Sequence, residues 1–369
     1  MSPPGKGFGP SREKQEQHLQ RLLVQAVQHH QVGELEKASS LYQQVLQARP
    51  THPEALHLLG VCRQQQGSLE EAIALIGQAL AHQPWFPDAH FNLGIVLKQA
   101  GRLAEAKTHL QLALEQGGPD PEVLYQLGLV LRQRGELEAA LVPLRQALEL
   151  QPDFADAAYT LAILLRDCGR EEEATELFYR LWQADPADLA AALGWCVSQL
   201  PLLYDTPEQI PVARERYRQA LHQVKARWEQ LPRDPETLEQ AAAGVGSVQP
   251  FFLPYQGQND RELQQLYGSL VGEVMAARYP QPPLLRQRRP GRLRVGIVSG
   301  LFRDHSVWKI LTHGWVEALD RSQVALYGFH TSAVQDEITR SLPPRFEQFV
   351  AGSRSLEEWQ ATIREAQLD

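Results

Sequence analysis

The sequence has few cysteines and no apolar stretch long enough to cross a membrane. Its three cysteines, Cys62, Cys168 and Cys196, are widely spaced and form no CxxC pair, which excludes a disulfide framework and a zinc knuckle. The N-terminal stretch MSPPGKGFGPSREK lacks the apolar core of a signal peptide. The most apolar stretch, residues 189–204, contains Ser, Gln and Pro and falls short of the roughly 18 apolar residues that a spanning helix needs. We therefore predict a cytoplasmic protein without a membrane span.

The chain also lacks an excess of positive charge and the common nucleotide-binding motifs. Its formal net charge of −8 argues against a broad cationic surface for nucleic acid. Neither GxGxxG nor GxxxxGK[ST] occurs, and the neighbours His29 and His30 have no third ligand at a spacing typical of a metal site. We therefore expect no nucleic-acid partner, no metal and no cofactor.

What the chain does contain is a 34-residue repeat. Glycines recur at this spacing, and an alanine follows each of them five residues later. The glycines are Gly33, Gly67, Gly101, Gly135 and Gly169. This pattern resembles the tetratricopeptide repeat, TPR, a unit of two helices joined by a turn. We predict a disordered tail at 1–18 and five repeats at 19–52, 53–86, 87–120, 121–154 and 155–188.

The first helix of each predicted repeat directs its fifth, ninth and twelfth positions into a groove. The fifth positions of repeats three to five are Phe91, Tyr125 and Tyr159, and the twelfth positions are Lys98, Arg132 and Arg166. An aromatic row beside a basic row suits a protein partner that offers an extended peptide with acidic or backbone acceptors. The alternative is that the aromatic rings pack between helices and the cations form a solvated face.

After the repeats the pattern changes twice. Helical periodicity without the 34-residue register continues through a connector at 189–290. Expected strands at 293–298, 324–330 and 346–350 then alternate with expected helices at about 306–319, 335–342 and 355–367. This alternation predicts a parallel sheet, a partial Rossmann-like lobe at 291–369. The predicted fold is therefore a mainly α solenoid followed by a partial α/β lobe.

His305 lies in the stretch RVGIVSGLFRDHSVW, directly after the first expected strand of that lobe. Open α/β sheets place ligands at the carboxyl ends of their strands, and the free amides at the start of the next helix favour negative charge there. His305 is therefore a candidate site residue. The alternative is an imidazole that caps the helix or faces solvent.

Together with the repeats, the stretches QPFFLPYQGQNDREL and LRVGIVSGLFRDHSV resemble the bacterial and cyanobacterial relatives of the O-linked N-acetylglucosamine transferases, the SPINDLY-like family 41 glycosyltransferases. The resemblance covers about residues 19–369 and ends within the first of that family's two catalytic lobes. It implies that His305 is the catalytic histidine of that lobe, with Phe302 as its packing partner, and assigns no donor-binding residue. It also implies an asparagine ladder in the groove, of which Asn92 remains.

Two functions follow from these observations. The first is the N-terminal portion of a protein O-glycosyltransferase, which moves a sugar from a nucleotide donor to Ser or Thr of proteins held by the repeats. We expect this chain alone to be inactive, because a UDP-sugar donor requires the second lobe of a full-length form. The alternative is a non-catalytic TPR adaptor for protein–protein interaction.

Overall fold

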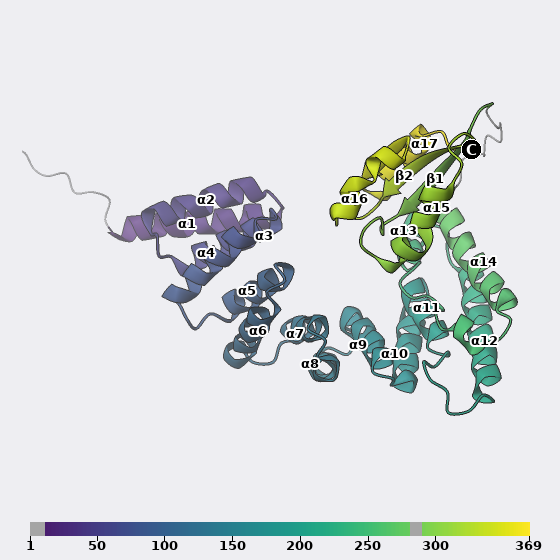
Figure 1. Cartoon of the computed structure of the whole chain (residues 1–369). Helices are drawn as coiled ribbons and strands as arrows, with labels where there is room; N and C mark the ends of the chain where they lie inside the picture. Colours follow the sequence, from purple (N-terminus) through teal and green to yellow (C-terminus); the bar gives the residue numbers. More distant parts are fainter. Residues whose placement is uncertain (1–11, 281–289) are drawn as a thin grey trace, which may run out of the picture. The chain divides into compact units, whose positions relative to one another are not determined.

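The computed structural model describes residues 12–280 and 290–369. The chain divides into two compact units, Met1–Pro280 and Gln281–Asp369 (Figure 1). Of the tail predicted at 1–18, residues 1–11 lie outside the described residues, but residues 12–18 belong to the first helix and correct that prediction. Their Glu, Lys and Gln side chains favour helix, and Glu16 forms an ion pair of 2.6 Å with Arg49. The predicted end of the connector, residue 290, borders residues 281–289, which also lie outside the described part.

The first unit begins with five helix–turn–helix pairs. They are α1 (Arg12–Gln31) and α2 (Leu35–Ala48), α3 (Pro53–Gln65) and α4 (Leu69–His82), α5 (Pro87–Gln99) and α6 (Leu103–Gly117), α7 (Pro121–Gln133) and α8 (Leu137–Leu150), and α9 (Ala155–Asp167) and α10 (Glu171–Ala184). The turn glycines found at 34-residue spacing all have φ between +73° and +82°. L side chains rarely adopt this conformation, which explains the glycine column.

A second column of small residues brings the two helices of a repeat together. A Cβ atom added to Gly94 or Gly128 would lie 2.7 Å from Cγ of Leu110 or Leu144, so only a residue without a side chain fits there without movement. The resulting hydrophobic core runs without interruption from Ala72 to Phe178. The predicted solenoid is therefore confirmed as a fold.

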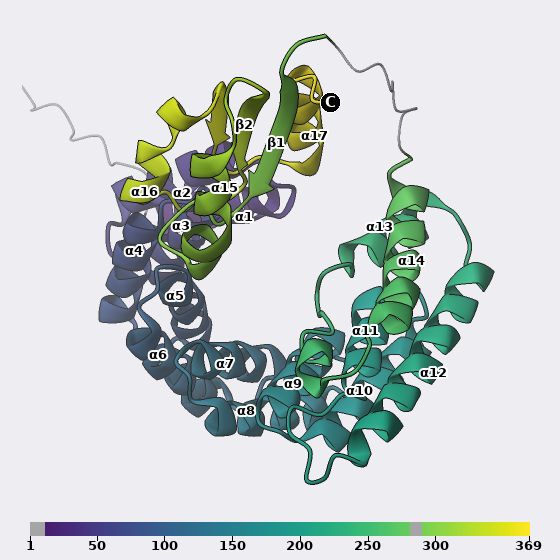
Figure 2. The same ribbon diagram turned by 45° about the vertical axis from the view of Figure 1, so that its right-hand side comes forward.

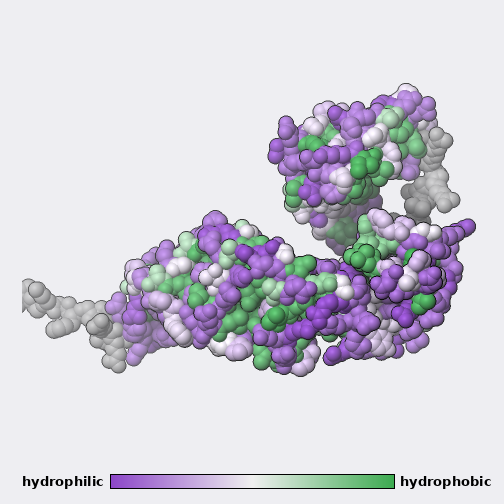
Figure 3. Space-filling view, turned by 60° about the horizontal axis from the view of Figure 1, so that its bottom comes forward, coloured by the Kyte–Doolittle hydropathy of each residue, from purple (hydrophilic) through white to green (hydrophobic). Residues whose placement is uncertain are grey.

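Successive pairs stack side by side, and the unit curves. Figure 2 shows α5 and α7 on the inner side of the curve and α6 and α8 on the outer side. The surface view in Figure 3 shows apolar patches among the hydrophilic residues of this unit. No helix in the described ranges has both the length and the apolar character of a membrane span.

The predicted connector extends the first unit by a helical bundle. It contains α11 (Leu189–Val197), α12 (Gln209–Gln230), α13 (Pro235–Ala243), a 3-10 turn at Leu253–Gln256 and α14 (Arg261–Arg278). Its own hydrophobic core begins at Trp182 of α10. Arg214 of α12 forms an ion pair of 2.7 Å with Asp260 and donates to Oε1 of Gln256 at 2.9 Å. These contacts hold the stretch QPFFLPYQGQNDREL against α12.

The second unit is a small α/β structure. Its strands β1 (Leu293–Ser299), β2 (Val324–His330) and β3 (Gln348–Ala351) form a parallel sheet in the order β1-β2-β3. Gly296 lies opposite Tyr327, which in turn lies opposite Gln348. The sheet is flanked by a π-helical turn at Trp308–Thr312, α15 (His313–Ala318), α16 (Glu337–Ser341), a 3-10 turn at Pro343–Arg345 and α17 (Leu356–Glu365). The predicted parallel α/β fold is confirmed.

Two hydrophobic clusters cover the two faces of this sheet. Phe302, Trp308, Leu326 and Phe346 belong to one cluster, whereas Tyr327, Phe329 and Trp359 belong to the other. Side chains of consecutive strand residues point to opposite faces. The central strand β2 is therefore apolar along almost its whole length, as a parallel strand covered on both sides requires.

Candidate functional site

The aromatic residues predicted for the groove lie on successive first helices, α5, α7 and α9. Phe91, Tyr125 and Tyr159 are half-buried and pack against the core of the solenoid. The ring of Tyr125 lies 5.1 Å from that of Phe154, and the ring of Tyr159 lies 5.5 Å from that of Phe178. The rings thus fill the junctions between helices, as the alternative interpretation predicts, and still leave part of their surface to solvent.

Polar contacts join neighbouring repeats along the same face. His57, which is 4% exposed, accepts a hydrogen bond at Nε2 from Nδ2 of Asn92 at 2.8 Å. Burial lowers the pKa of His57 to about 4, so its imidazole is neutral at pH 7. A further hydrogen bond joins Tyr125 to Thr160, and burial raises the pKa of the Tyr125 hydroxyl. Asn92 therefore connects two repeats.

The three predicted cations differ in their surroundings. Nζ of Lys98 donates to Oε1 of Gln126, and Nε2 of Gln126 donates to Glu122 at 2.8 Å. Burial lowers the pKa of Lys98, against the opposing effect of Glu122. In contrast, Arg132 and Arg166 are half-buried, and their guanidinium groups form no hydrogen bond or ion pair within the described residues. Guanidinium groups are strong hydrogen-bond donors to carboxylates.

The loop after β1 carries the other predicted site. Phe302 is fully buried, with its ring 5.8 Å from those of Trp308 and Phe346. His305 is half-buried, and its Nδ1 accepts from the backbone N–H of Val307 at 3.1 Å. This contact is that of a helix cap, the alternative considered for this residue. The structure places His305 at the carboxyl end of β1, and its catalytic role stays a prediction.

The helix α16 holds this loop in place. Its first residue is preceded by Asp336, whose carboxylate accepts from the backbone N–H of Asp304 at 2.6 Å. This hydrogen bond, together with that from the Thr339 amide, lowers the pKa of Asp336 to about 2. The Thr339 hydroxyl in turn donates to the carbonyl oxygen of Phe302 at 2.6 Å. The backbone around His305 is therefore well anchored at neutral pH.

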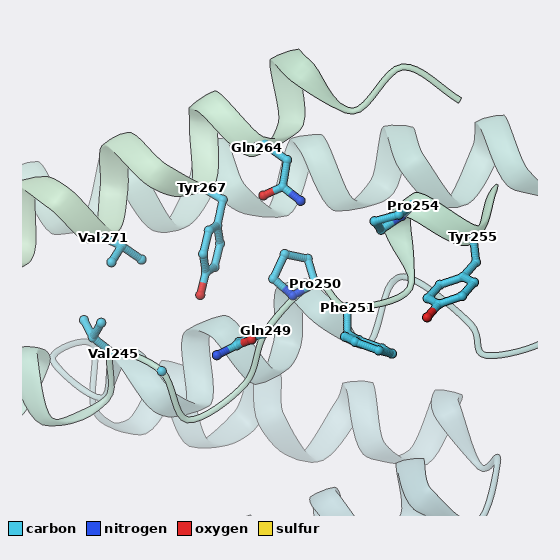
Figure 4. A pocket seen from close by; sticks show the side chains of 10 residues that line it. Val245, Gln249, Pro250, Phe251, Pro254, Tyr255, Gln264, Tyr267 and Val271 are labelled. Atoms are coloured by element: carbon cyan, nitrogen blue, oxygen red, sulfur yellow. The ribbon is translucent and has the colours of Figure 1, made fainter. Parts of the chain in front are cut away.

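A pocket in the connector was not anticipated as a site. It encloses about 520 Å³ and is lined by Val245, Gly246, Gln249, Pro250, Phe251, Pro254, Tyr255, Gln264, Tyr267 and Val271. Figure 4 shows the two valines at one end and Phe251 and Tyr255 at the other. The side chain of Phe251 is 62% exposed and that of Tyr255 75% exposed. The aromatic and proline residues of QPFFLPYQG were the available signal, but only the fold shows that they surround a hollow.

Family models of the tetratricopeptide repeat match residues 29–79 and 64–127, and another TPR repeat model matches residues 128–169. Among the part of the chain that the structure describes, no group of three or more His, Cys, Asp or Glu residues is arranged to hold a metal ion. The stretch from residue 29 to residue 169 is thus built of tetratricopeptide repeats, which are known to bind peptides and proteins.

Several solved structures are similar to part of this chain. YrrB, described as a TPR protein with an unusual peptide-binding site, is 21% identical over 50% of this chain and 91% of its own, with a TM-score of 0.44. MamA is 22% identical over 44% of this chain and 94% of its own, with a TM-score of 0.42. A tetratricopeptide repeat protein from Parabacteroides merdae is 18% identical over 70% of this chain and 99% of its own, with a TM-score of 0.46. No curated protein matches the chain.

Proposed function

We propose that the first unit is an adaptor that captures a partner protein through an extended acidic peptide lying along α5, α7 and α9. The observation that carries this proposal is the state of Arg132 and Arg166. Both residues are half-buried and follow the aromatic residues Tyr125 and Tyr159 on the same helices. Their guanidinium groups have no hydrogen-bond or ion-pair partner among the described residues. A partly desolvated guanidinium group gains more from a carboxylate than an exposed one does, because it has already lost water.

The remaining groove residues support the same ligand. The exposed parts of Tyr125 and Tyr159 offer apolar surface and aromatic edges to an extended chain, and Oδ1 of Asn92 can accept from a backbone N–H. Lys98 contributes less, because Gln126 already accepts its hydrogen bond. The expected ligand is therefore a peptide with two carboxylates spaced to reach neighbouring helices.

Reversing the charges of Arg132 and Arg166 should strongly weaken binding of an acidic peptide. We expect the variant with Arg132→Glu and Arg166→Glu to bind a synthetic Asp- and Glu-rich peptide about 100-fold more weakly than the unaltered chain. Fluorescence polarisation with the dye-labelled peptide at several salt concentrations measures this change. The matched control carries Arg216→Glu and Arg227→Glu on α12, which are exposed residues with the same change of charge. Equal losses in both variants, or unchanged binding in the first, would argue against the groove.

A second candidate function concerns the C-terminal unit, which would form the first part of the catalytic lobe of a protein O-glycosyltransferase. In this function His305 lies beside the acceptor hydroxyl, and Phe302 packs against the loop that carries His305. The position of His305 at the carboxyl end of β1 favours it. The experiment is an immunoblot of native extract with an antibody against residues 53–188. A band well above 41.5 kDa would support this candidate and lead to assays of His305→Ala in the longer protein. A band near 41.5 kDa would overturn this candidate.

A further inference from the structure

A second cavity lies at the junction of repeats four and five, between α8 and α10. It encloses about 910 Å³ and is larger than the pocket of the connector. The last turns of α8 and α10 form its sides, and the turn before α9 forms one end. None of the residues predicted for the groove lines it.

The size of this cavity has a cause in the repeat register. A cavity of about 340 Å³ lies at the preceding junction, and each of its lining residues has a counterpart 34 residues later in the lining of the larger one. Two of these counterparts are much smaller: Leu124 corresponds to Ala158, and Leu150 corresponds to Ala184. Leucine side chains therefore occupy one junction, whereas alanines leave the next one open.

The cavity combines an apolar floor with an acidic rim. Leu148, Phe154, Leu177 and Leu181 are half-buried and line it together with the buried Leu161. The rim carries the carboxylates of Glu149, Asp153, Glu176, Asp185 and Asp188.

The charged groups of the rim do not neutralise one another. The carboxylates of Glu149, Asp153 and Glu176 have no hydrogen bond or ion pair within the described residues. Of the two arginines in the lining, Arg145 is already paired at 2.6 Å with Glu173, which lies outside the lining. Only Arg180 remains to oppose the carboxylates, so the rim has an excess of negative charge.

We propose that this cavity is a second peptide-binding site, specific for a basic segment in which Lys or Arg flanks a large apolar residue. The apolar side chain occupies the space left by Ala158 and Ala184 and buries the exposed parts of the leucines. The flanking cations reach the rim carboxylates, so the charge of the ligand is opposite to that expected for the groove. This site is independent of the proposed acidic-peptide groove, and one protein can thus hold two partners of different charge.

Filling the cavity tests the proposal directly. The probe is a synthetic peptide in which Lys and Arg alternate with Leu and Phe, titrated calorimetrically into the full chain. Ala158→Leu, which installs the residue found at the equivalent position 124, is expected to weaken binding at least about tenfold. The matched control is Ala139→Leu, which adds the same side chain at an exposed position of α8 outside the lining and is expected to leave binding unchanged.

A second variant covers the case in which Ala158→Leu does not fold. The double variant with Glu149→Gln and Glu176→Gln keeps the shape of two exposed side chains but removes their charge. We expect it to bind the basic peptide about tenfold more weakly, with a smaller salt dependence of binding. A peptide with Glu in place of each basic residue should not bind to this site. Equal affinity of the acidic and basic peptides, no binding of the basic peptide, or full binding by either cavity variant would overturn the proposal.

Discussion

Replacing Phe302 by alanine is expected to unfold the C-terminal unit and leave the repeats intact. Phe302 is fully buried and packs against Trp308, Phe346 and Phe349, with ring centroids 5.5 to 5.8 Å apart. Removing a buried aromatic ring costs about 3–5 kcal/mol. In a domain of roughly 80 residues a single hydrophobic core supplies only about 3–5 kcal/mol of net stability, so this loss removes most of it.

Hydrogen exchange followed by mass spectrometry on the full chain separates the two units. Peptides from β1, β2 and β3 should lose their protection in Phe302→Ala, whereas peptides from α3 to α9 should keep theirs. The control is Ile310→Ala, because Ile310 is 83% exposed and its truncation leaves no cavity. Retained protection in the three strands of Phe302→Ala would show that this ring does not hold the unit together.

Acidification should destabilise the repeats, and His57 should cause much of the loss. Burial lowers its pKa to about 4, whereas an unfolded histidine has a pKa of about 6.5. Between these values the unfolded chain binds a proton that the folded chain does not. The stability contributed by the neutral, buried His57 is therefore complete above pH 6.5 and decreases as the pH falls towards 4. From pH 7 to pH 5 this loss is about 2 kcal/mol.

Two other histidines act in the same direction. His90 and His109 approach within 2.9 Å through their Nδ1 atoms, so one nitrogen must donate and the other must accept. Protonation of the accepting nitrogen would remove the acceptor of this hydrogen bond. Burial lowers the pKa of both residues, and their protonation on unfolding adds to the loss below neutral pH.

Urea unfolding at pH 7 and pH 5 measures this effect. His57→Gln keeps an acceptor for the Asn92 amide but does not titrate, so we expect the difference between the two pH values to shrink by about 2 kcal/mol. His82→Gln, a change of an exposed histidine on α4, should leave the difference unaltered. An unchanged pH dependence in His57→Gln would show that this imidazole is protonated equally in both states.

Much of the fold follows from spacing alone. The glycines 34 residues apart predict the turns because only glycine readily adopts their positive φ. The alternation of strands and helices after residue 290 likewise predicts the parallel sheet. Each of these features depends on the conformation of a short segment or on the spacing of residues along one helix or strand. Both can be read directly from the sequence.

The sites required the tertiary structure, because they depend on which residues meet. In sequence, Lys98, Arg132 and Arg166 form one equivalent row. Only the fold shows that Gln126 accepts from Lys98, whereas the two guanidinium groups have no partner among the residues that the structure describes. The same is true of Asn92, whose partner His57 lies in another repeat. The cavity between α8 and α10 is visible in sequence only as two alanines in place of leucines. These smaller residues leave a cavity because the core keeps the backbones of successive repeats at the same spacing.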